Sequence, residues 1–214
     1  KLTAGGAVSW AKKFGSTSSD NLGGLTEVAD TLYLGGLAYS SAFTKIGGGS
    51  PTFTYYDALL VKINKSNGNI IWAKTYDIGN TSNWVSYIQP SSTGIHLDIT
   101  NMVAWSSSNA YNVSFDLDRN GIPSKSIRLN LSSVNNSYVT GSMPTFDGGY
   151  ITGHLRLDTA GNTILQKINA GGAITWSNSL KIPGSQYLRQ AIQTRDSSFA
   201  AAGVDKSNAL FIKT

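Results

Sequence analysis

The 214-residue chain contains no cysteine, and only 14% of its residues are charged, against about 25% in an average globular protein. The absence of cysteine excludes a disulfide scaffold and any metal site or nucleophile that depends on a thiolate. No apolar run reaches the ~18 residues of a membrane-spanning helix, so we expect no membrane insertion. No segment keeps an apolar period of 3.6 residues, which predicts that helix is nearly absent.

Positive charge exceeds negative charge, with a formal net charge of +5, but it is scattered along the chain. The only adjacent pair of basic residues is Lys12 and Lys13. A nucleic-acid-binding surface needs basic residues gathered on one face. The sequence therefore predicts no nucleic-acid partner.

Glycine is abundant, at 23 of the 214 residues, compared with an average of about 7%. Serine, threonine, asparagine, valine and isoleucine are also frequent. Low charge combined with these residues is typical of an all-β protein with many turns.

One hairpin motif recurs along the chain. Lys167 to Trp176 reads KINAGGAITW, and Lys1 to Trp10 reads KLTAGGAVSW. A third copy, Lys62 to Trp72, has one extra turn residue, and a degraded fourth copy, Leu117 to Lys125, has Lys in place of Trp. Glycine and asparagine in the turns supply the positive φ that tight hairpins need.

A second hairpin lies between successive copies of the first, with turn residues near its middle. The four second hairpins are predicted at Leu22 to Tyr39, Trp84 to Thr100, Ser137 to Leu155 and Tyr187 to Val204. The recurring motif itself predicts one strand before its turn and one strand after it. The strands before the turn are predicted at Asp57 to Ile63, Ala110 to Leu117, Asn162 to Ile168 and Asn208 to Thr214. The strands after the turn are predicted at Ala7 to Phe14, Asn69 to Tyr76, Ile122 to Leu129 and Ala173 to Leu180.

Together the two hairpins make a unit of four short strands that returns after roughly 50 residues, which is typical of a β-propeller blade. We therefore predict an all-β fold for 1–214, a single β-propeller domain of four four-stranded antiparallel blades. The segment Ala7 to Phe14 is expected to close the last blade as its fourth strand, which would remove both open edges. The alternative is a four-blade segment of a larger propeller. We also expect the chain to be a mature or excised segment, with any export signal upstream.

These hairpins resemble a known family. The stretch DALLVKINKSNGNIIWAKTY, Asp57 to Tyr76, and the turn FDGGYITG, Phe146 to Gly153, are similar to secreted bacterial propeller repeats related to the quinoprotein-like propellers. The resemblance implies a propeller fold in an exported or cell-surface protein with an adhesive or unknown role. It says more about fold and location than about activity.

Three groups of residues could have a functional role, and each can also be explained by a structural role. Trp10, Trp72 and Trp176 could form a ligand-stacking ring, but repetition at one strand position favours packing between blades. The run that begins at Asp116 starts like a calcium loop, yet it lacks the glutamate at position 12 and aligns with the hairpin turns. The two histidines, His96 and His154, have no carboxylate or cysteine motif around them, so we predict no metal and no cofactor.

The strongest functional signal is a set of aromatic residues in the longer loops that join the hairpins. They are Phe53, Tyr55, Tyr56, Trp84, Trp105 and Tyr111. Aromatic rings among serine, threonine and asparagine suit stacking on sugars or burial in a protein interface. The alternative is that these rings fold down over the ends of the blades.

Three functions follow from this sequence. The first is a non-enzymatic secreted or cell-surface module that binds a protein or glycan through its aromatic loops and acts in adhesion. The second is a structural subunit that packs against copies of itself in an extracellular assembly, since a weakly charged surface resists association less. An enzyme of the quinoprotein-like or hydrolytic kind is third, because no nucleophile motif is present.

Overall fold

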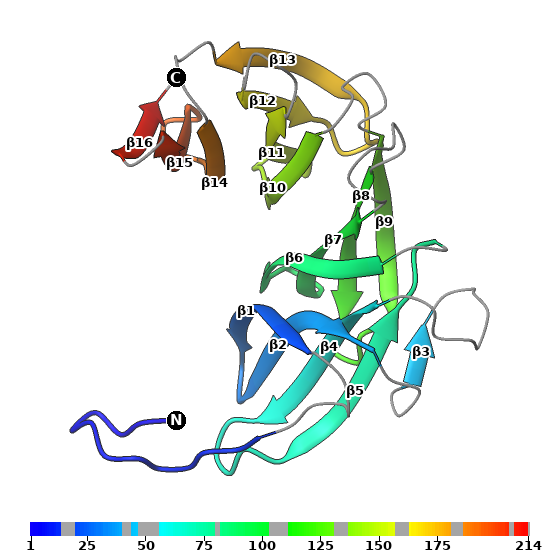
Figure 1. Ribbon diagram of the computed structural model, residues 1–214, viewed down its shortest axis with the longest axis vertical. Coiled ribbons are helices and arrows are strands. Elements are labelled where there is room, and N and C mark those ends of the chain that lie inside the picture. Colours follow the sequence, from blue (N-terminus) through cyan, green and yellow to red (C-terminus); the bar gives the residue numbers. More distant parts are fainter. Residues whose placement is uncertain are drawn as a thin grey trace. The chain divides into compact units, whose positions relative to one another are not determined.

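The computed structural model of the chain describes residues 1–13, 20–39, 44–46, 56–79, 82–102, 111–130, 137–156, 163–180, 186–205 and 208–213. Every strand or helix assigned within these residues is a β-strand (Figure 1). None of the described segments forms a helix that is long and apolar enough to cross a membrane.

The strands form four successive antiparallel sheets. The first contains β1 (Asn21–Val28), β2 (Thr31–Ala38), β4 (Asp57–Asn64) and β5 (Ile70–Tyr76), with β3 (Thr44–Ile46) beyond β5. The second contains β6 (Ser82–Pro90), β7 (Gly94–Met102), β8 (Tyr111–Asp118) and β9 (Pro123–Asn130). The third contains β10 (Ser137–Pro144), β11 (Tyr150–Arg156), β12 (Thr163–Ile168) and β13 (Ile174–Leu180), and the fourth contains β14 (Gln186–Gln193), β15 (Phe199–Asp205) and β16 (Asn208–Lys213).

This order confirms the predicted all-β fold of the four-bladed propeller class, with one sheet for each blade. All four second hairpins and their turns lie where the sequence predicts them. The first sheet differs from the prediction because the long loop after β2 contributes β3, which runs parallel to β5 and pairs Thr44 with Lys74. That edge is therefore covered by a strand that the repeat does not encode.

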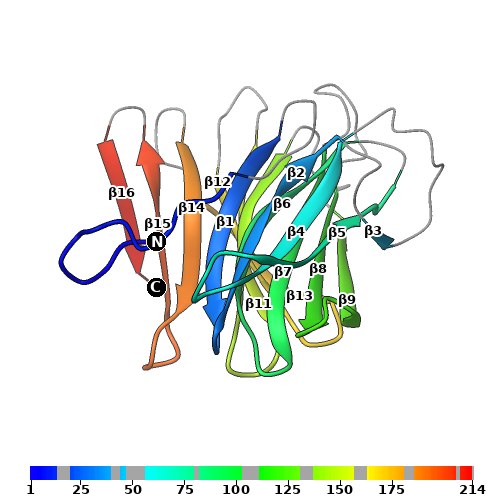
Figure 2. The same cartoon turned by 90° about the horizontal axis from the view of Figure 1, so that it is seen from below.

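The prediction that Ala7 to Phe14 completes the last blade stays a prediction, because the N-terminal segment belongs to one compact unit and β16 to the other. Among the described residues, the last sheet contains β14, β15 and β16. The N-terminal segment, in dark blue in Figure 2, contains a small bridge of Leu2 with Val8. The indole N–H of Trp10 donates to the Lys65 carbonyl, in the β4–β5 turn, at 3.1 Å.

The chain divides into two compact units, Lys1–Ile99 with Asp116–Lys125, and Thr100–Phe115 with Ser126–Thr214. The first unit has a core around Leu59, Val61 and Ile63, against which Trp10 packs. The second has a core around Ile151, Leu165 and Leu188, against which Trp176 packs. The prediction of one domain for 1–214 stays a prediction.

The strands contain β-bulges, and these bulges recur at equivalent positions in different sheets. In the first, third and fourth sheets the first strand has a bulge, between Leu22 and Gly24, Val139 and Gly141, and Leu188 and Gln190. The last strand of the first and third sheets has another, next to the pairs Lys62–Trp72 and Lys167–Trp176. Bulges bend and twist a strand at a fixed place. Their recurrence indicates that the repeat encodes the bending of these strands as well as their positions.

Two of the three repeated tryptophans pack against glycine in a hairpin turn. A Cβ on Gly68 would lie 2.6 Å from Trp10 Cε3, and one on Gly121 would lie 2.8 Å from Trp72 Cη2. Both glycines have a positive φ, 75° and 73°. Trp176 meets the next sheet through an edge-to-face contact with Phe199, at 5.3 Å between ring centroids. The packing interpretation of these tryptophans is therefore confirmed.

We predict that Gly121→Ala destabilises the fold more than Gly148→Ala. Both glycines have φ near 75°, so both variants should lose about 1–2 kcal/mol for the left-handed conformation. The Cβ at position 121 would also lie 2.7 Å from Tyr76 Oη, whereas at position 148 its nearest neighbour would be Ala170 Cβ at 3.7 Å. Overpacking should therefore cost Gly121→Ala about 1–3 kcal/mol more. Urea unfolding measures the free energy of unfolding of both variants. Equal losses of stability in the two variants would contradict the packing argument.

Candidate functional site

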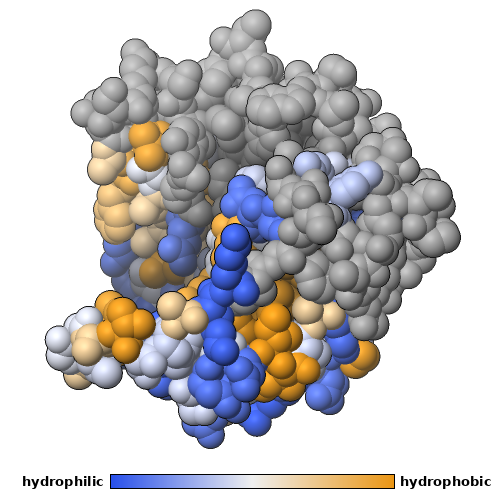
Figure 3. Space-filling view, turned by 60° about the horizontal axis from the view of Figure 1, so that its bottom comes forward, coloured by the Kyte–Doolittle hydropathy of each residue, from blue (hydrophilic) through white to orange (hydrophobic). Residues whose placement is uncertain are grey.

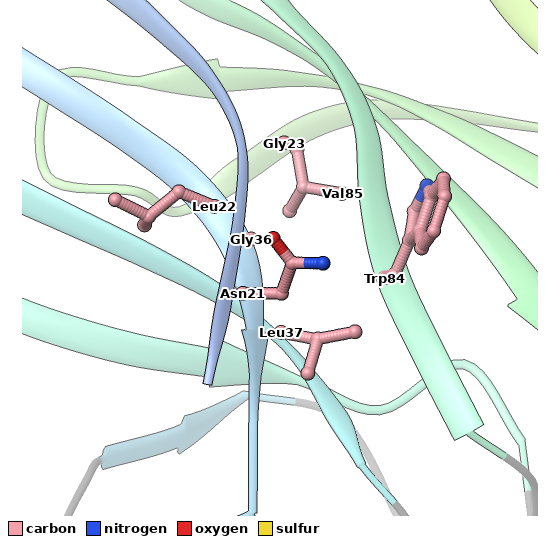
Figure 4. A pocket seen from close by; sticks show the side chains of 7 residues that line it. All are labelled: Asn21, Leu22, Gly23, Gly36, Leu37, Trp84 and Val85. Atoms are coloured by element: carbon pink, nitrogen blue, oxygen red, sulfur yellow. The ribbon is translucent and has the colours of Figure 1, made fainter. Parts of the chain in front are cut away.

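A groove in the first unit lies between the first strands of two successive sheets. Its lining comes from β1, β2 and β6, and Figure 4 shows it from close by. The residues that line it are Asn21, Leu22, Gly23, Gly36, Leu37, Trp84 and Val85, around a cavity of about 60 Å³. The groove is mainly apolar, with the Asn21 amide as its polar side chain.

Glycines bring β6 onto the first sheet and so form the floor of the groove. A Cβ on Gly23 would lie 2.2 Å from the Val85 carbonyl oxygen, and one on Gly35 would lie 2.4 Å from Val85 Cγ1. A Cβ on Gly24 would lie 2.7 Å from Ile88 Cγ2. Side chains at these positions would push β6 outward. The glycine pairs in β1 and β2 therefore mark a close backbone approach, as glycine within a strand often does.

Trp84 forms one wall of the groove and keeps 39% of its surface exposed. In Figure 4 the side chains of Asn21 and Leu37 extend from β1 and β2 toward the side on which Trp84 lies. An exposed indole offers a flat apolar face, and the asparagine amide both donates and accepts hydrogen bonds. The groove therefore combines a stacking surface with a neutral polar group.

Two tyrosines form an aromatic pair at the ends of β2 and β4. Tyr39 follows β2 and Tyr56 precedes β4, and their rings meet edge to face at 5.5 Å between centroids. The Tyr56 carbonyl accepts a hydrogen bond of 2.7 Å from the backbone N–H of Asn83, the residue before Trp84. This bond ties the start of β4 to the start of β6. We call Tyr39, Tyr56 and Trp84 the aromatic face.

Apolar side chains continue from the aromatic face onto the neighbouring surface. Leu22 and Leu25 of β1 are 54% and 59% exposed. Figure 3 shows hydrophobic surface (orange) next to hydrophilic surface (blue) on the side that it presents. Exposed apolar patches on soluble proteins often mark interaction sites.

Of the six predicted site residues, Trp84 lines the groove, and Tyr56 is linked to β6 through the backbone hydrogen bond from Asn83. Three others, Phe53, Tyr55 and Trp105, lie outside the described residues. Tyr111 belongs to the second unit, where the Arg128 guanidinium lies 3.8 Å from the centre of its ring. The Tyr111 hydroxyl also accepts a hydrogen bond of 3.4 Å from Asn101 Nδ2. Tyr111 is thus half-buried and engaged within its own unit.

Sequence reasoning missed Asn21, Leu37 and Tyr39. Asn21 and Leu37 lie where β1 begins and β2 ends, and they pair directly across the two strands. An apolar or amide residue at a strand end is too common to signal a site. Tyr39 could have been found, because it follows the predicted second hairpin immediately and borders the same loop as Tyr56.

A second cluster in the first unit surrounds His96, which is fully buried. Its Nδ1 lies 2.9 Å from Asp116 Oδ1, and its Nε2 lies 3.3 Å from Asp98 Oδ1. The expectation that His96 has no carboxylate nearby is therefore wrong. Asp98 is two residues further along β7, the strand that contains His96. Asp116 comes from β8, the next strand of the sheet, and the sequence pattern could not place it beside His96. The side chain of His154 lies outside the described residues.

This cluster is built as a structural ion pair. Burial lowers the pKa of His96, but the charges of Asp98 and Asp116 and their hydrogen bonds to the ring outweigh it and raise the pKa to about 9. The two carboxylates lie on opposite ring nitrogens and do not converge on one point. Among the described residues no group of three histidine, aspartate or glutamate side chains is placed to hold a metal ion.

The suspected calcium loop at Asp116 is an ordinary hairpin turn between β8 and β9. Asp118 Oδ1 accepts the backbone N–H groups of Asn120 and Ile122, each at 2.8 Å. These bonds lower the pKa of Asp118 below its usual value. Asp118 therefore stabilises its own turn, as asparagine and aspartate side chains commonly do.

No protein-family model and no curated protein matches the chain. Its fold is similar to that in the crystal structure of a protein of unknown function from Bacteroides caccae, with a TM-score of 0.50 and 8% sequence identity. The match covers 92% of this chain and 61% of that one, so the chain spans about three fifths of that protein's length. A likeness at this identity shows the fold alone.

The pKa of His96 predicts that the protein loses stability at alkaline pH. The pKa is about 6.5 in the unfolded chain and about 9 in the folded one, so the stabilisation is complete below pH 6.5 and disappears as pH rises through 9. The loss should be on the order of 3 kcal/mol. Urea unfolding across this pH range measures it, with His96→Gln as the comparison. Equal pH dependence in both proteins would contradict an imidazolium held by Asp98 and Asp116.

Proposed function

We propose that this chain is a non-enzymatic ligand-binding module of a secreted or cell-surface protein that acts in adhesion. The observation that carries the proposal is the exposed indole of Trp84 next to the Asn21 amide in the groove. The secreted or cell-surface location is supported by the similarity of the hairpins to exported bacterial propeller repeats.

A glycan is the ligand whose chemistry fits the groove best. The C–H groups on one face of a sugar ring carry partial positive charge and can lie on the electron-rich face of an indole. Ring hydroxyls can exchange hydrogen bonds with the Asn21 amide, which both donates and accepts. Because the lining residues are uncharged, a neutral sugar fits better than an acidic one. Tyr39 and Tyr56 offer further aromatic surface for a neighbouring sugar unit.

Trp84→Ala should abolish or strongly weaken glycan binding. Loss of a stacking ring at the centre of a small site commonly costs 1–2 kcal/mol or more, so we expect about tenfold weaker binding to the glycans that the wild-type chain retains on an array. Phe146→Ala is the matched control, because Phe146 is an exposed aromatic residue of the second unit, 70% exposed, and lies outside the groove.

The control should bind as the wild type does, and circular dichroism should show that both variants are folded. If the wild-type chain retains no glycan, or if Trp84→Ala and Phe146→Ala bind equally well, a glycan site at this groove is wrong. Binding to a purified cell-surface protein that is lost only in Trp84→Ala would keep the aromatic face as the site and replace the glycan by a protein ligand.

A further inference from the structure

The cavity in the groove of the first unit is too small for a whole sugar ring. Its volume is about 60 Å³. An apolar cavity of about 150 Å³ binds benzene, which has six heavy atoms, so in the same ratio this cavity accepts a group of about two or three heavy atoms. A sugar ring that lies on Trp84 must therefore stay outside the cavity, and only a substituent of the ring can enter it.

The lining of the cavity selects the chemistry of that substituent. Leu22, Leu37 and Val85 contribute apolar side chains, and Gly23 and Gly36 contribute none. A hydroxyl group in these surroundings would exchange its hydrogen bonds to water for contacts with carbon, which costs free energy. A methyl group would instead gain free energy by leaving water. The lining thus favours a substituent that ends in a methyl group.

Asn21 adds an amide to this lining, and the amide is available to a ligand. Asn21 is exposed, and no hydrogen bond joins its side chain to another described residue. Figure 4 shows the amide between the side chains of Val85 and Leu37, with Trp84 on the far side of the groove. A carboxamide carries both a donor and an acceptor. Its best partner is a second amide, which can return both hydrogen bonds.

We propose that the groove binds an N-acetylated amino sugar, with the acetamido group in the cavity and the sugar ring on Trp84. This assignment rests on the proposed function, because it takes the glycan site as given. The acetyl methyl group lies against Leu37 and Val85, and the acetamido N–H and C=O exchange hydrogen bonds with Asn21. A hydroxymethyl group lacks the methyl end, and the methyl group of a 6-deoxy sugar lacks the amide. The acetamido group offers both, at the size that the cavity accepts.

Sugars that differ only in the acetamido group test this directly. The probes are the methyl glycosides of N-acetylglucosamine and N-acetylgalactosamine, each compared with the methyl glycoside of its parent sugar, glucose or galactose. Titrations of the intact chain, followed by NMR, measure the dissociation constant of each probe. We expect each acetylated glycoside to bind roughly tenfold more tightly than its parent, because a buried methyl group and an additional hydrogen bond both add to the affinity.

Asn21→Asp should remove this preference and leave the stacking on Trp84 intact. The two side chains have the same shape, but a carboxylate cannot donate a hydrogen bond to the acetyl carbonyl. We expect the acetylated glycosides to bind roughly tenfold more weakly. The parent sugars should change little, because a carboxylate still accepts from their hydroxyl groups. Asn69→Asp is the matched control, since it makes the same change at an exposed asparagine outside the groove, and it should bind as the wild type does.

The outcomes separate this assignment from the glycan site itself. Equal binding of the acetylated and parent glycosides, lost in Trp84→Ala, would overturn the acetamido site and leave the glycan site standing. A preference for the acetylated glycosides that Asn21→Asp does not change, or that Asn69→Asp changes equally, would overturn the role of the Asn21 amide and with it the assignment. Tighter binding of a methyl 6-deoxyglycoside would also overturn it. If no glycoside binds and the array retains no glycan, the glycan site and the acetamido site are both wrong.

Discussion

The packing of an aromatic ring onto a glycine in the next hairpin turn is the contact on which the fold depends. Trp10 lies on Gly68 and Trp72 lies on Gly121, so each ring fixes where the following hairpin begins. Lys62 Nζ and Tyr33 Oη strengthen the second of these joints by donating to the Arg119 carbonyl. A large ring buries much apolar area, and the glycine lets it approach the backbone. The second sheet is positioned on the first by a turn and a ring that the repeat encodes together.

The same use of glycine creates the candidate site. Because Gly23 and Gly35 carry no Cβ, Val85 packs directly against the first sheet, and this places the neighbouring Trp84 next to Asn21 and Leu37. The groove is thus a consequence of how two sheets approach each other, and its wall is the first residue along β6 that the packing leaves exposed. The candidate site and the packing therefore share β6 but use different side chains of it.

Two buried basic side chains, His96 and Lys167, are held by specific carboxylate partners. His96 lies between Asp98 and Asp116, and Lys167 lies on Asp147 in the turn between β10 and β11. Thr145 and Lys167 lower the pKa of Asp147 well below its usual value, mainly through hydrogen bonds. Unpaired charges inside a protein cost several kcal/mol. With only 14% charged residues, the chain confines its charge to such pairs and to a weakly charged surface.

The sequence by itself determined the strands, the turns and the blade repeat, because these depend on local patterns: alternating apolar residues, glycine at positive φ and the recurring Trp10, Trp72 and Trp176. It also indicated Tyr56 and Trp84, which border the long loops. Only the tertiary structure decided that Asn21 and Leu37 complete a groove, that Asp116 reaches His96, and that Trp10 rests on Gly68. These contacts join residues that are distant in sequence. They depend on how closely the backbones of different strands approach each other, and a local sequence pattern contains no information about that distance.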